Sequence, residues 1–226
     1  MQIQASTLYL LDERQRMVAV NEPDPPPAPR LFIGRTRAGQ IWRFRHDLST
    51  SLTEELETAL RAEPVATDLT RPLACLDAVG AALTRHAPLT DTSAGPALRF
   101  PDDLLRGQHD VIHITPAHDA VVRDIFPILA HDLPWRQPCF AIVEDGRLAS
   151  ICYSARNSHV AAEVGVDTIP AYRGRGYAAS VTTAWARAVR AEGRIPLYST
   201  SWENTASQSV ARKLGLVMYG EDLAFA

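Results

Sequence analysis

A turn with two glycines, between an apolar segment and a helix-like segment, is the part of the sequence best suited to binding a ligand. Gly174 and Gly176 allow main-chain N–H groups to converge on an anion without a Cβ atom in the way. Residues 177–192 contain no helix breaker, and Gly193 is a natural helix end. An anion in the turn would lie at a helix N-terminus, where free N–H groups and the helix dipole favour negative charge. The spacing therefore predicts a pyrophosphate site.

Two segments together resemble one known family. Residues 173–178 fit the pattern Arg-x-x-Gly-x-Ala, between Pro170 and the predicted helix. The next segment, residues 201–216, reads Ser-Trp-Glu-Asn-Thr-Ala-Ser-Gln-Ser-Val-Ala-Arg-Lys-Leu-Gly-Leu. In this order and at this spacing, the two segments resemble the acyl-CoA-binding motif and the following helix of the GNAT superfamily of N-acyltransferases. The resemblance covers residues 108–226, about half of the chain.

The resemblance implies an α/β fold, with a GNAT-like mixed sheet flanked by helices, and acetyl-CoA as the acyl donor. The donor would lie where the central strand and the strand after the helix diverge. The main chain of Val166 and Thr168 would bind the pantetheine, and Asn204 matches a position that contacts the pantetheine or its sulfur. The residues implied to bind the pyrophosphate are Arg173, Gly174, Arg175, Gly176, Tyr177, Ala178 and Ala179.

Transfer of an acyl group from a thioester to an amine needs a group that removes a proton from the amine. The resemblance implies a glutamate on the central strand, and Glu163 is the candidate base. Its apolar neighbours, among them Ala162 and Val164, would desolvate the carboxylate and raise its pKa. A solvent-facing or salt-bridged role for Glu163 is an equal alternative. Asp167 and Glu203 are weaker candidates for the base.

The acid that protonates the leaving thiolate is a second implied group. In the family it is usually a tyrosine three residues before the leucine of Lys-Leu-Gly, and this position is Ala211 here. Ser207 is the candidate acid, and Tyr198, Tyr219 or water are the alternatives. For each tyrosine, a packed ring with a hydrogen-bonded hydroxyl is the more common role.

Other catalytic patterns have little support in the sequence. His109 and His113 have helical spacing on a predicted strand, so their side chains need not converge on a metal. The sequence contains no Gly-x-Ser-x-Gly motif, and the Gly174–Gly176 turn is too short for a dinucleotide fingerprint. Neither a metal nor a nicotinamide cofactor is expected.

The second half of the chain contains the elements that must position these residues. Asp145-Gly146 predicts a hairpin turn, and Pro127 should interrupt the first helix. The predicted strands are 111–115, 139–143, 147–154, 161–168, 196–201 and 217–225, and the predicted helices are 116–131, 177–192 and 204–214. This order is close to the GNAT fold, but it contains less sheet than the family usually has. The N-terminal half is expected to supply sheet or a wall of the site.

The first half predicts an N-terminal α+β domain of unknown role over residues 1–105, with the GNAT-like domain over 106–226. Two short strands are expected within residues 5–20, a hairpin over 31–46 and a short strand at 97–100. The predicted helices are 51–62, with a capping box at Ser51 and Glu54, and 72–85. The proline-rich segment 22–30 indicates a stiff spacer, with a PxxP ligand as the less favoured alternative.

Composition limits the location and the partners of the protein. The formal net charge of −3 argues against general nucleic-acid binding, and no run approaches the roughly 18 apolar residues of a membrane span. The N-terminus lacks the pattern of a secretory signal. Cys75, Cys139 and Cys152 are far apart and odd in number, as expected for reduced thiols. A cytoplasmic protein without membrane or nucleic-acid partners is expected.

These features predict an N-acetyltransferase that moves an acetyl or another short acyl group from its CoA thioester to an amine. The amine would attack directly in a ternary complex, and the acceptor would be a small molecule or a peptide. Because Ala211 replaces the usual acid, a non-catalytic acyl-CoA-binding or regulatory module is the alternative. A protein-interaction adaptor is a third and weaker one. The oligomeric state, the acyl chain length and the identity of the acceptor are left open.

Overall fold

The computed structural model describes residues 1–104 and 107–226. Within these residues, nine strands form one continuous sheet, and a separate hairpin lies nearby. The hairpin consists of β1 (Tyr9–Leu11) and β2 (Met17–Val20). The strands of the sheet are β3 (Leu31–Thr36), β4 (Gly39–Phe44), β5 (Thr92–Arg99), β6 (Ile112–His113), β7 (Phe140–Glu144), β8 (Arg147–Asn157), β9 (Ala161–Thr168), β10 (Ile195–Ser199) and β11 (Val217–Phe225).

The sheet is antiparallel except at one position near its middle. The strands follow one another in the order β4-β3-β11-β5-β10-β9-β8-β7-β6. Strands β9 and β10 pair in parallel, and only Ala161–Glu163 and Ile195–Leu197 take part. The two strands then diverge, while β9 stays paired with β8 as far as Thr168. One edge of β9 is therefore unpaired after Glu163. The mixed α/β sheet that the sequence predicted is confirmed.

Strand β5 connects the two halves of the chain. It comes from the N-terminal half, yet it lies between β10 and β11 and pairs antiparallel with both. Strands β3 and β4 extend the same sheet beyond β11. The expected boundary between residues 105 and 106 falls on the two residues outside the described ones. Strand pairing joins the two halves, because β5 of the N-terminal half pairs with β10 and β11 of the C-terminal half.

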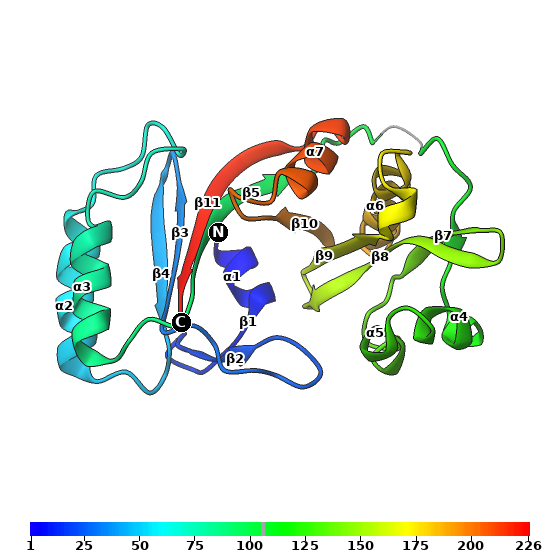
Figure 1. Ribbon diagram of the computed structural model, residues 1–226. Helices are drawn as coiled ribbons and strands as arrows, with labels where there is room; N and C mark the ends of the chain where they lie inside the picture. The colour runs from blue at the N-terminus through cyan, green and yellow to red at the C-terminus, as the bar shows by residue number, and fades with distance from the viewer. Residues whose placement is uncertain (105–106) are drawn as a thin grey trace.

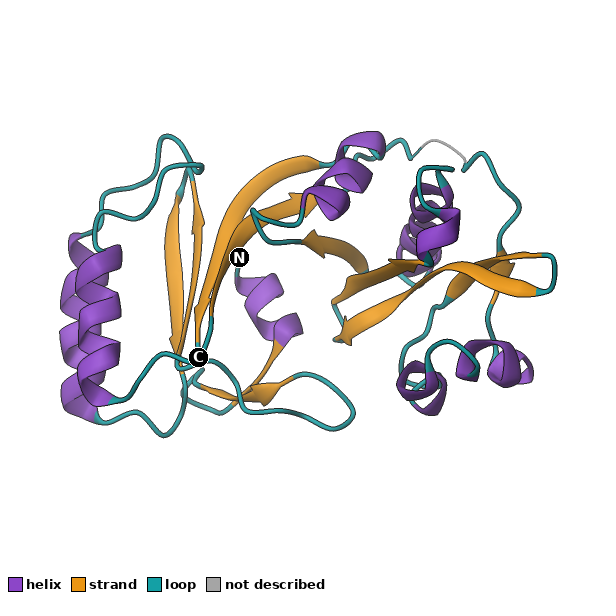
Figure 2. Cartoon of the chain, viewed as in Figure 1, coloured by secondary structure: helices purple, strands orange, loops and turns teal. Residues whose placement is uncertain are grey.

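Helices cover both faces of the sheet (Figures 1 and 2). Helix α6 packs on β7, β8, β9 and β10, whereas α1 packs on β8 and β9. Figure 1 shows α1 between the β5–β11 part of the sheet and the β8–β9 part. The described helices are α1 (Gln2–Leu8), α2 (Thr50–Ala62), α3 (Leu76–His86), α4 (Asp119–Arg123), α5 (Pro127–His131), α6 (Tyr177–Ala191) and α7 (Thr205–Lys213), with 3₁₀ turns at Pro116–His118 and Pro170–Tyr172. None of these helices is long and apolar enough to span a membrane.

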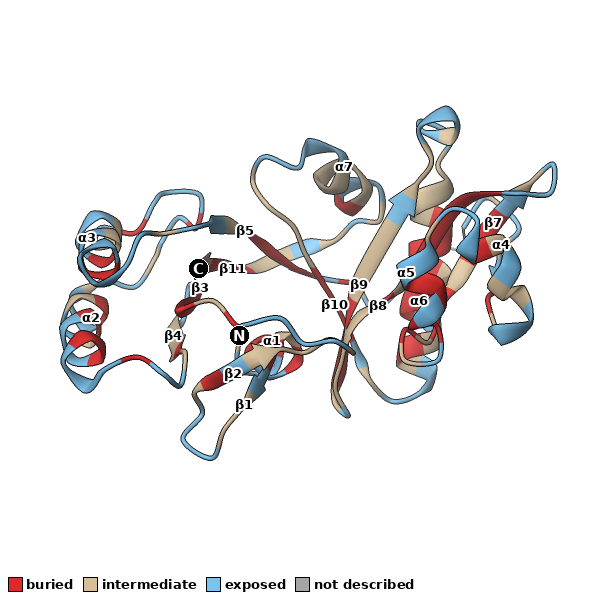
Figure 3. Ribbon diagram, turned by 60° about the horizontal axis from the view of Figure 1, so that its bottom comes forward, coloured by how far each residue is buried: buried red, intermediate tan, exposed pale blue. Residues whose placement is uncertain are grey.

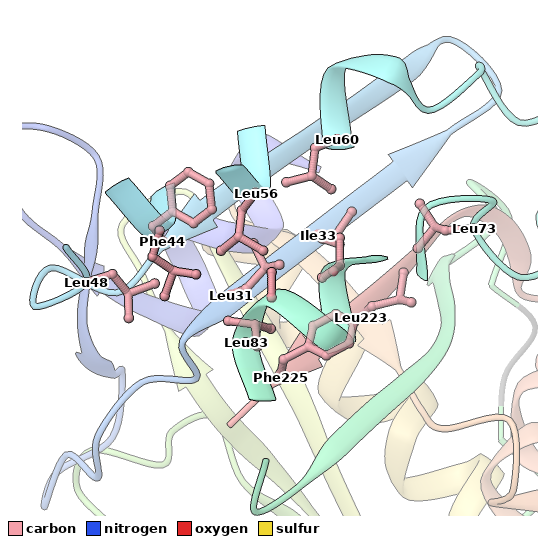
Figure 4. Close-up of a cluster of buried hydrophobic side chains, with 13 residues drawn as sticks. Leu31, Ile33, Phe44, Leu48, Leu56, Leu60, Leu73, Leu83, Leu223 and Phe225 are labelled. Carbon is pink, nitrogen blue, oxygen red and sulfur yellow. The ribbon is translucent and has the colours of Figure 1, made fainter. Parts of the chain in front are cut away.

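The hydrophobic core is divided among several clusters. At one end of the sheet, α2 and α3 cover β3, β4 and β11 through the side chains of Figure 4, among them Leu56, Leu83 and Phe225. A second cluster surrounds the fully buried Trp185 and lies between α6 and the sheet. Figure 3 shows buried residues along β5 and β8 and on one side of α6. The loop before α6 is therefore attached to a rigidly packed helix.

Some sequence predictions differ from the structure. Residues 5–8, which were expected to begin the first of two short strands, belong to helix α1, although the β1–β2 pair that follows is as expected. Helix α2 is capped by Ser49, whose hydroxyl accepts from Leu52 N, and not by Ser51. Strand β5 begins at Thr92, well before the predicted start at residue 97. The predicted interruption at Pro127 is confirmed, because this residue begins α5 after the break that follows α4.

Gly95 on β5 provides a test of this packing. A Cβ atom at Gly95 would lie 1.7 Å from the carbonyl oxygen of Thr200, whereas one at Gly80 in α3 would meet nothing within 4 Å. Because the clash is with main chain, we expect Gly95→Ala to destabilise the fold by about 2–3 kcal/mol. Gly80→Ala should be neutral or stabilising by up to about 1 kcal/mol. Urea unfolding of both variants measures this difference, and equal stabilities would contradict the close approach.

Candidate active site

The loop before α6 has the main-chain geometry of an anion site. Gly174 has φ 81° and Gly176, the N-cap residue of α6, has φ 85°. A side chain would fit in the space at Gly174, so the backbone conformation is what favours glycine there. In residues 1–104 and 107–226, no protein group accepts from the main-chain N–H groups of residues 174–179. These free donors lie at the positive end of a long helix, as the sequence predicted.

The side chains of the loop are already bonded to protein groups. Arg175 Nη1 lies 2.8 Å from Glu144 Oε1, and the Tyr177 hydroxyl donates to Glu144 Oε2 at 2.6 Å. Arg173 Nε donates to the carbonyl of Thr168 at 3.2 Å. His109 Nε2 lies 2.9 Å from the carbonyl oxygen of Arg175. These contacts with neighbouring segments fix the position of the loop. The groups of the loop that remain available to a ligand are its main-chain N–H groups.

A cavity of about 690 Å³ lies beside this loop. Among the described residues, it is bounded by the loop, the first turns of α6, the C-terminal end of α7, and residues 101, 103, 104, 107 and 108. Its charged lining residues are Arg175, Arg212 and Lys213 against one acid, Asp103. The cavity is large enough for part of a nucleotide, and its charge suits phosphate groups.

The unpaired edge of β9 leads from this loop toward the centre of the sheet. Val166 and Thr168 lie on β9 and are half-buried. Both pair with β8 on the other side, opposite Cys152 and Ser150. The Thr168 hydroxyl lies 2.8 Å from the Ser150 hydroxyl. An extended ligand could use the free main-chain groups of this edge as a neighbouring strand would.

Glu163 lies at the point where β9 and β10 diverge. The residue is only 5% exposed, and its Oε1 accepts from both the main-chain N and the hydroxyl of Ser199, each at 2.7 Å. Its other oxygen, Oε2, is buried and has no partner among the described residues. Burial raises the pKa of Glu163 to about 7, against the opposing effects of the Ser199 hydrogen bonds and the Arg156 charge. The carboxyl group can therefore gain and lose a proton near neutral pH.

A second carboxyl group near Glu163 was not predicted from the sequence. Burial raises the pKa of Asp222 on β11 to about 8, with further contributions from Glu163 and Glu221. The side-chain amide of Gln4 on α1 donates to Asp222, and its carbonyl accepts from the Tyr219 hydroxyl. One signal was available, because Asp222 and its neighbour Glu221 are two consecutive acids inside a predicted strand. Its contact with Gln4 joins distant parts of the sequence and could not be inferred.

The candidate acid Ser207 lies near the start of α7. Its hydroxyl is 2.8 Å from the hydroxyl of Tyr198, and burial raises the pKa of Tyr198 to about 12. Asn204 caps α7 by accepting from Ser207 N at 3.0 Å, as predicted. Ala211, at the position of the family's usual acid, is buried in the core beneath α7.

The candidate base and the candidate acid lie on opposite faces of the sheet. Glu163 is in register with Leu197 and bonds to Ser199, so these side chains share one face. Tyr198 lies between them in β10 and faces α7 instead. The opening between β9 and β10 is therefore flanked by a carboxyl group on one side and a hydroxyl pair on the other. Asp167 and Glu203, the weaker candidates for the base, are exposed.

Comparisons with known proteins bear on the family and the fold of the chain. Residues 138–221 match the family described as GNAT acetyltransferase. A GNAT-family protein from Novosphingobium aromaticivorans is similar with a TM-score of 0.50 and 19% identity, over 61% of this chain and 65% of that one. An acetyltransferase of the GNAT family from Colwellia psychrerythraea gives a TM-score of 0.52 and 13% identity, over 82% and 75%. No curated protein matches the sequence.

The match to the GNAT acetyltransferase family lies within the C-terminal half of the chain, and the two solved structures share its fold. The family resemblance inferred from the turn and from residues 201–216 is thus confirmed. The matched part of the chain spans slightly less than two thirds of the Novosphingobium protein. Because the sequence identities are low, the likeness to these solved structures shows a shared fold only. What this chain itself binds and transfers is inferred from its own site.

Glu163 makes the stability of the fold depend on pH. Its folded-state pKa of about 7 lies above the ordinary value of 4.5. As pH rises, the unfolded chain loses this proton first, so the stability of the wild type falls between about pH 4.5 and 7 and stays lower above. Glu163→Gln cannot ionise and escapes this loss. We therefore expect the variant to gain up to about 3 kcal/mol relative to wild type between pH 5 and pH 8.5.

Denaturant unfolding at the two pH values measures this gain. Glu203→Gln, which removes an exposed carboxylate, is the matched control and should show no such pH-dependent gain. If the free energies of unfolding of Glu163→Gln and wild type differ by the same amount at both pH values, the raised pKa of Glu163 is contradicted.

Proposed function

We propose that this protein transfers an acetyl or another short acyl group from acyl-CoA to an amine. The observation that carries the proposal is the unpaired edge of β9, which runs from a loop of free N–H groups to a buried carboxyl group with a pKa of about 7. Such an edge can bind an extended thioester donor, with its anionic end in the loop and its reactive end beside Glu163. The GNAT family match supports the donor class.

The donor is proposed to bind along this path as the family resemblance implied. The N–H groups of residues 174–179 would bind the pyrophosphate. The main chain of Val166 and Thr168 would bond to the pantetheine, with Asn204 near its sulfur. Arg212 and Lys213 in the adjoining cavity would add positive charge for the remaining phosphate of the nucleotide.

The proposed reaction is a direct attack in a ternary complex. The amine nitrogen bonds to the carbonyl carbon of the thioester, Glu163 takes a proton from the amine, and the carbon–sulfur bond breaks. Ser207 gives a proton to the departing thiolate and takes one from Tyr198 through their hydrogen bond. Tyr198 then regains a proton from solvent, and Glu163 releases its proton to solvent, so that both groups return to their starting states. The side chain of Glu163 can serve as base because burial raises its pKa to about 7, close to a neutral pH.

The acceptor is proposed to be an amine-bearing small molecule or peptide that approaches Glu163 from the face of α1. The three cysteines are free thiols in the structure, and Cys139 and Cys152 are buried. These thiols support the cytoplasm as the proposed location. Residues 1–105 are proposed to act as an N-terminal unit that completes the sheet and forms the α1 wall of the acceptor site.

Binding of acetyl-CoA is the first test. Isothermal titration should give micromolar binding to the wild type and none to Gly176→Trp, whose side chain would occupy the phosphate loop. Gly193→Trp is the matched control, because Gly193 also has a positive φ and lies at the other end of α6. It should lose similar stability but keep its affinity for acetyl-CoA. Equal loss of binding in both variants would attribute the effect to helix damage and contradict a site at the loop.

Turnover is the second test, followed as thiol release from acetyl-CoA with a panel of primary amines that includes spermidine and a lysine peptide. We expect Glu163→Gln to lower kcat about 10²- to 10⁴-fold with unchanged acetyl-CoA affinity. The wild-type rate should rise with pH through about 7, as Glu163 loses its proton. Ser207→Ala should lower kcat by a smaller factor, and Glu203→Gln should have no effect.

Two results would contradict the proposal. Acetyl-CoA binding without turnover on any amine would favour the non-catalytic acyl-CoA-binding module, which the alanine at position 211 also suggests. A Glu163→Gln variant that keeps the wild-type rate would remove Glu163 from the mechanism.

A further inference from the structure

The outer strand of the sheet lines a groove that is remote from the proposed active site. Strand β4 lies at one end of the strand order, and in the described part of the chain it pairs along its length only with β3. Figure 1 shows β4 as an outer strand beside α2. The groove measures about 420 Å³ and is lined by Arg14, Gln15, Arg16, Gln40, Ile41, Trp42, Arg43, Phe44, Thr53, Glu57 and Arg61.

The lining residues show that the groove runs along the edge of β4. Five consecutive residues of this strand, 40–44, contribute to it. Because successive side chains point to opposite faces of a sheet, a pocket on one face would touch only every second residue. Helix α2 borders the groove on one side and the β1–β2 turn on the other. The unpaired main chain of β4 therefore forms the floor of the groove.

The groove is strongly basic in a protein with a net charge of −3. Four of its eleven lining residues are arginines and one, Glu57, is an acid. Glu57 is paired with Arg61 at 3.1 Å, and the Arg61 guanidinium lies 5.7 Å from the centre of the Trp42 ring. In residues 1–104 and 107–226, Arg14, Arg16 and Arg43 form no ion pair with a carboxylate.

The arginines stand on both sides of the strand edge. Arg43 reaches the side of α1, where its guanidinium donates to the carbonyl of the Gln2 side chain. Arg14 and Arg16 lie in the β1–β2 turn, which is held by the carboxylate of Asp12 accepting from both of their main-chain N–H groups. Arg61 lies on α2. A strand in the groove would thus meet positive charge on each of its faces.

We propose that this groove binds an acidic, extended segment of a partner protein, which adds to the sheet as a strand beside β4. Hydrogen bonds between main chains would supply the affinity, and carboxylates of the segment would pair with the arginines. A second copy of β4 does not fit, because it would bring arginine side chains against one another. The arginines also disfavour pairing with uncharged strands, so the edge is selective for acidic segments and protected from non-specific aggregation.

Fluorescence anisotropy tests the proposal with a short fluorescein-labelled peptide in which glutamate alternates with valine. The wild type should bind this peptide and not a version with lysine in place of glutamate. Arg14→Ser/Arg61→Ser should weaken binding about fivefold to tenfold. The matched control is Arg123→Ser/Arg147→Ser, which removes two exposed arginines from the other end of the sheet and should bind as wild type does. Equal thermal midpoints would show that both double variants are folded.

Main-chain pairing is tested separately from charge. Alternate N–H groups of an extended peptide point to opposite edges. Two further acidic peptides therefore carry N-methyl groups on the odd-numbered or on the even-numbered amides, so that only one of them loses the N–H groups that face β4. One methylated peptide should lose binding and the other keep it. Hydrogen exchange at residues 40–44 should slow when the unmethylated peptide binds.

Four results would overturn the proposal. They are no binding of the acidic peptide, equal binding of both methylated peptides, unchanged exchange in β4, and tighter binding of oligouridine with the same dependence on the arginines. Self-association of the protein through β4, seen by sedimentation and abolished by Arg43→Pro, would assign the edge to a second copy instead.

Discussion

The two hydrogen bonds from Ser199 to Glu163 lie where the pairing between β9 and β10 ends, near the middle of the sheet. The Ser199 N–H lies just beyond the last residue of β10 that pairs with β9, and it donates to a side-chain carboxylate instead of a main-chain carbonyl of β9. The ladder between the two strands therefore ends without leaving this buried donor unsatisfied. The same contact fixes Glu163 at the point of divergence. The unpaired edge of β9 and the candidate base beside it therefore begin at this one interaction.

The rest of the sheet maintains that opening from both sides. On one side, β8 pairs with β9 and α6 packs beneath them. On the other side, β10 has only a short pairing with β9 and depends on β5 for its second neighbour. Helix α1 closes the face on which Glu163 lies, through Gln4 and through the contact of Thr7 with Ser158 at 3.0 Å. The N-terminal half therefore supplies both β5 and α1 to the part of the sheet around Glu163.

The sequence predicted the features that depend on neighbouring residues. The glycines at 174 and 176, the Asp145-Gly146 turn and the Asn204 cap each have a local cause, and the structure contains all three. Features that depend on distant segments were missed. Gly95 and Pro96 argue locally against a long strand, yet β5 runs through them because β11 pairs with both residues. Residues 2–8 form a helix whose polar side chains are buried because Asp222 and Ser158 bond to them. The identity of the candidate base was predicted, but its second carboxyl neighbour was not.

The position of β5 has a consequence for the order in which the protein is made. On the ribosome, β3 and β5 emerge before their common neighbour β11, which follows only after the intervening helices and strands have been synthesised. Until then, the edges of β3 and β5 that pair with β11 are unprotected, with Ile33 and Leu98 among the apolar residues that are later buried. Such long-range pairing slows folding and exposes the nascent chain to aggregation. The nascent chain therefore depends on protection of these two strand edges until β11 has been synthesised.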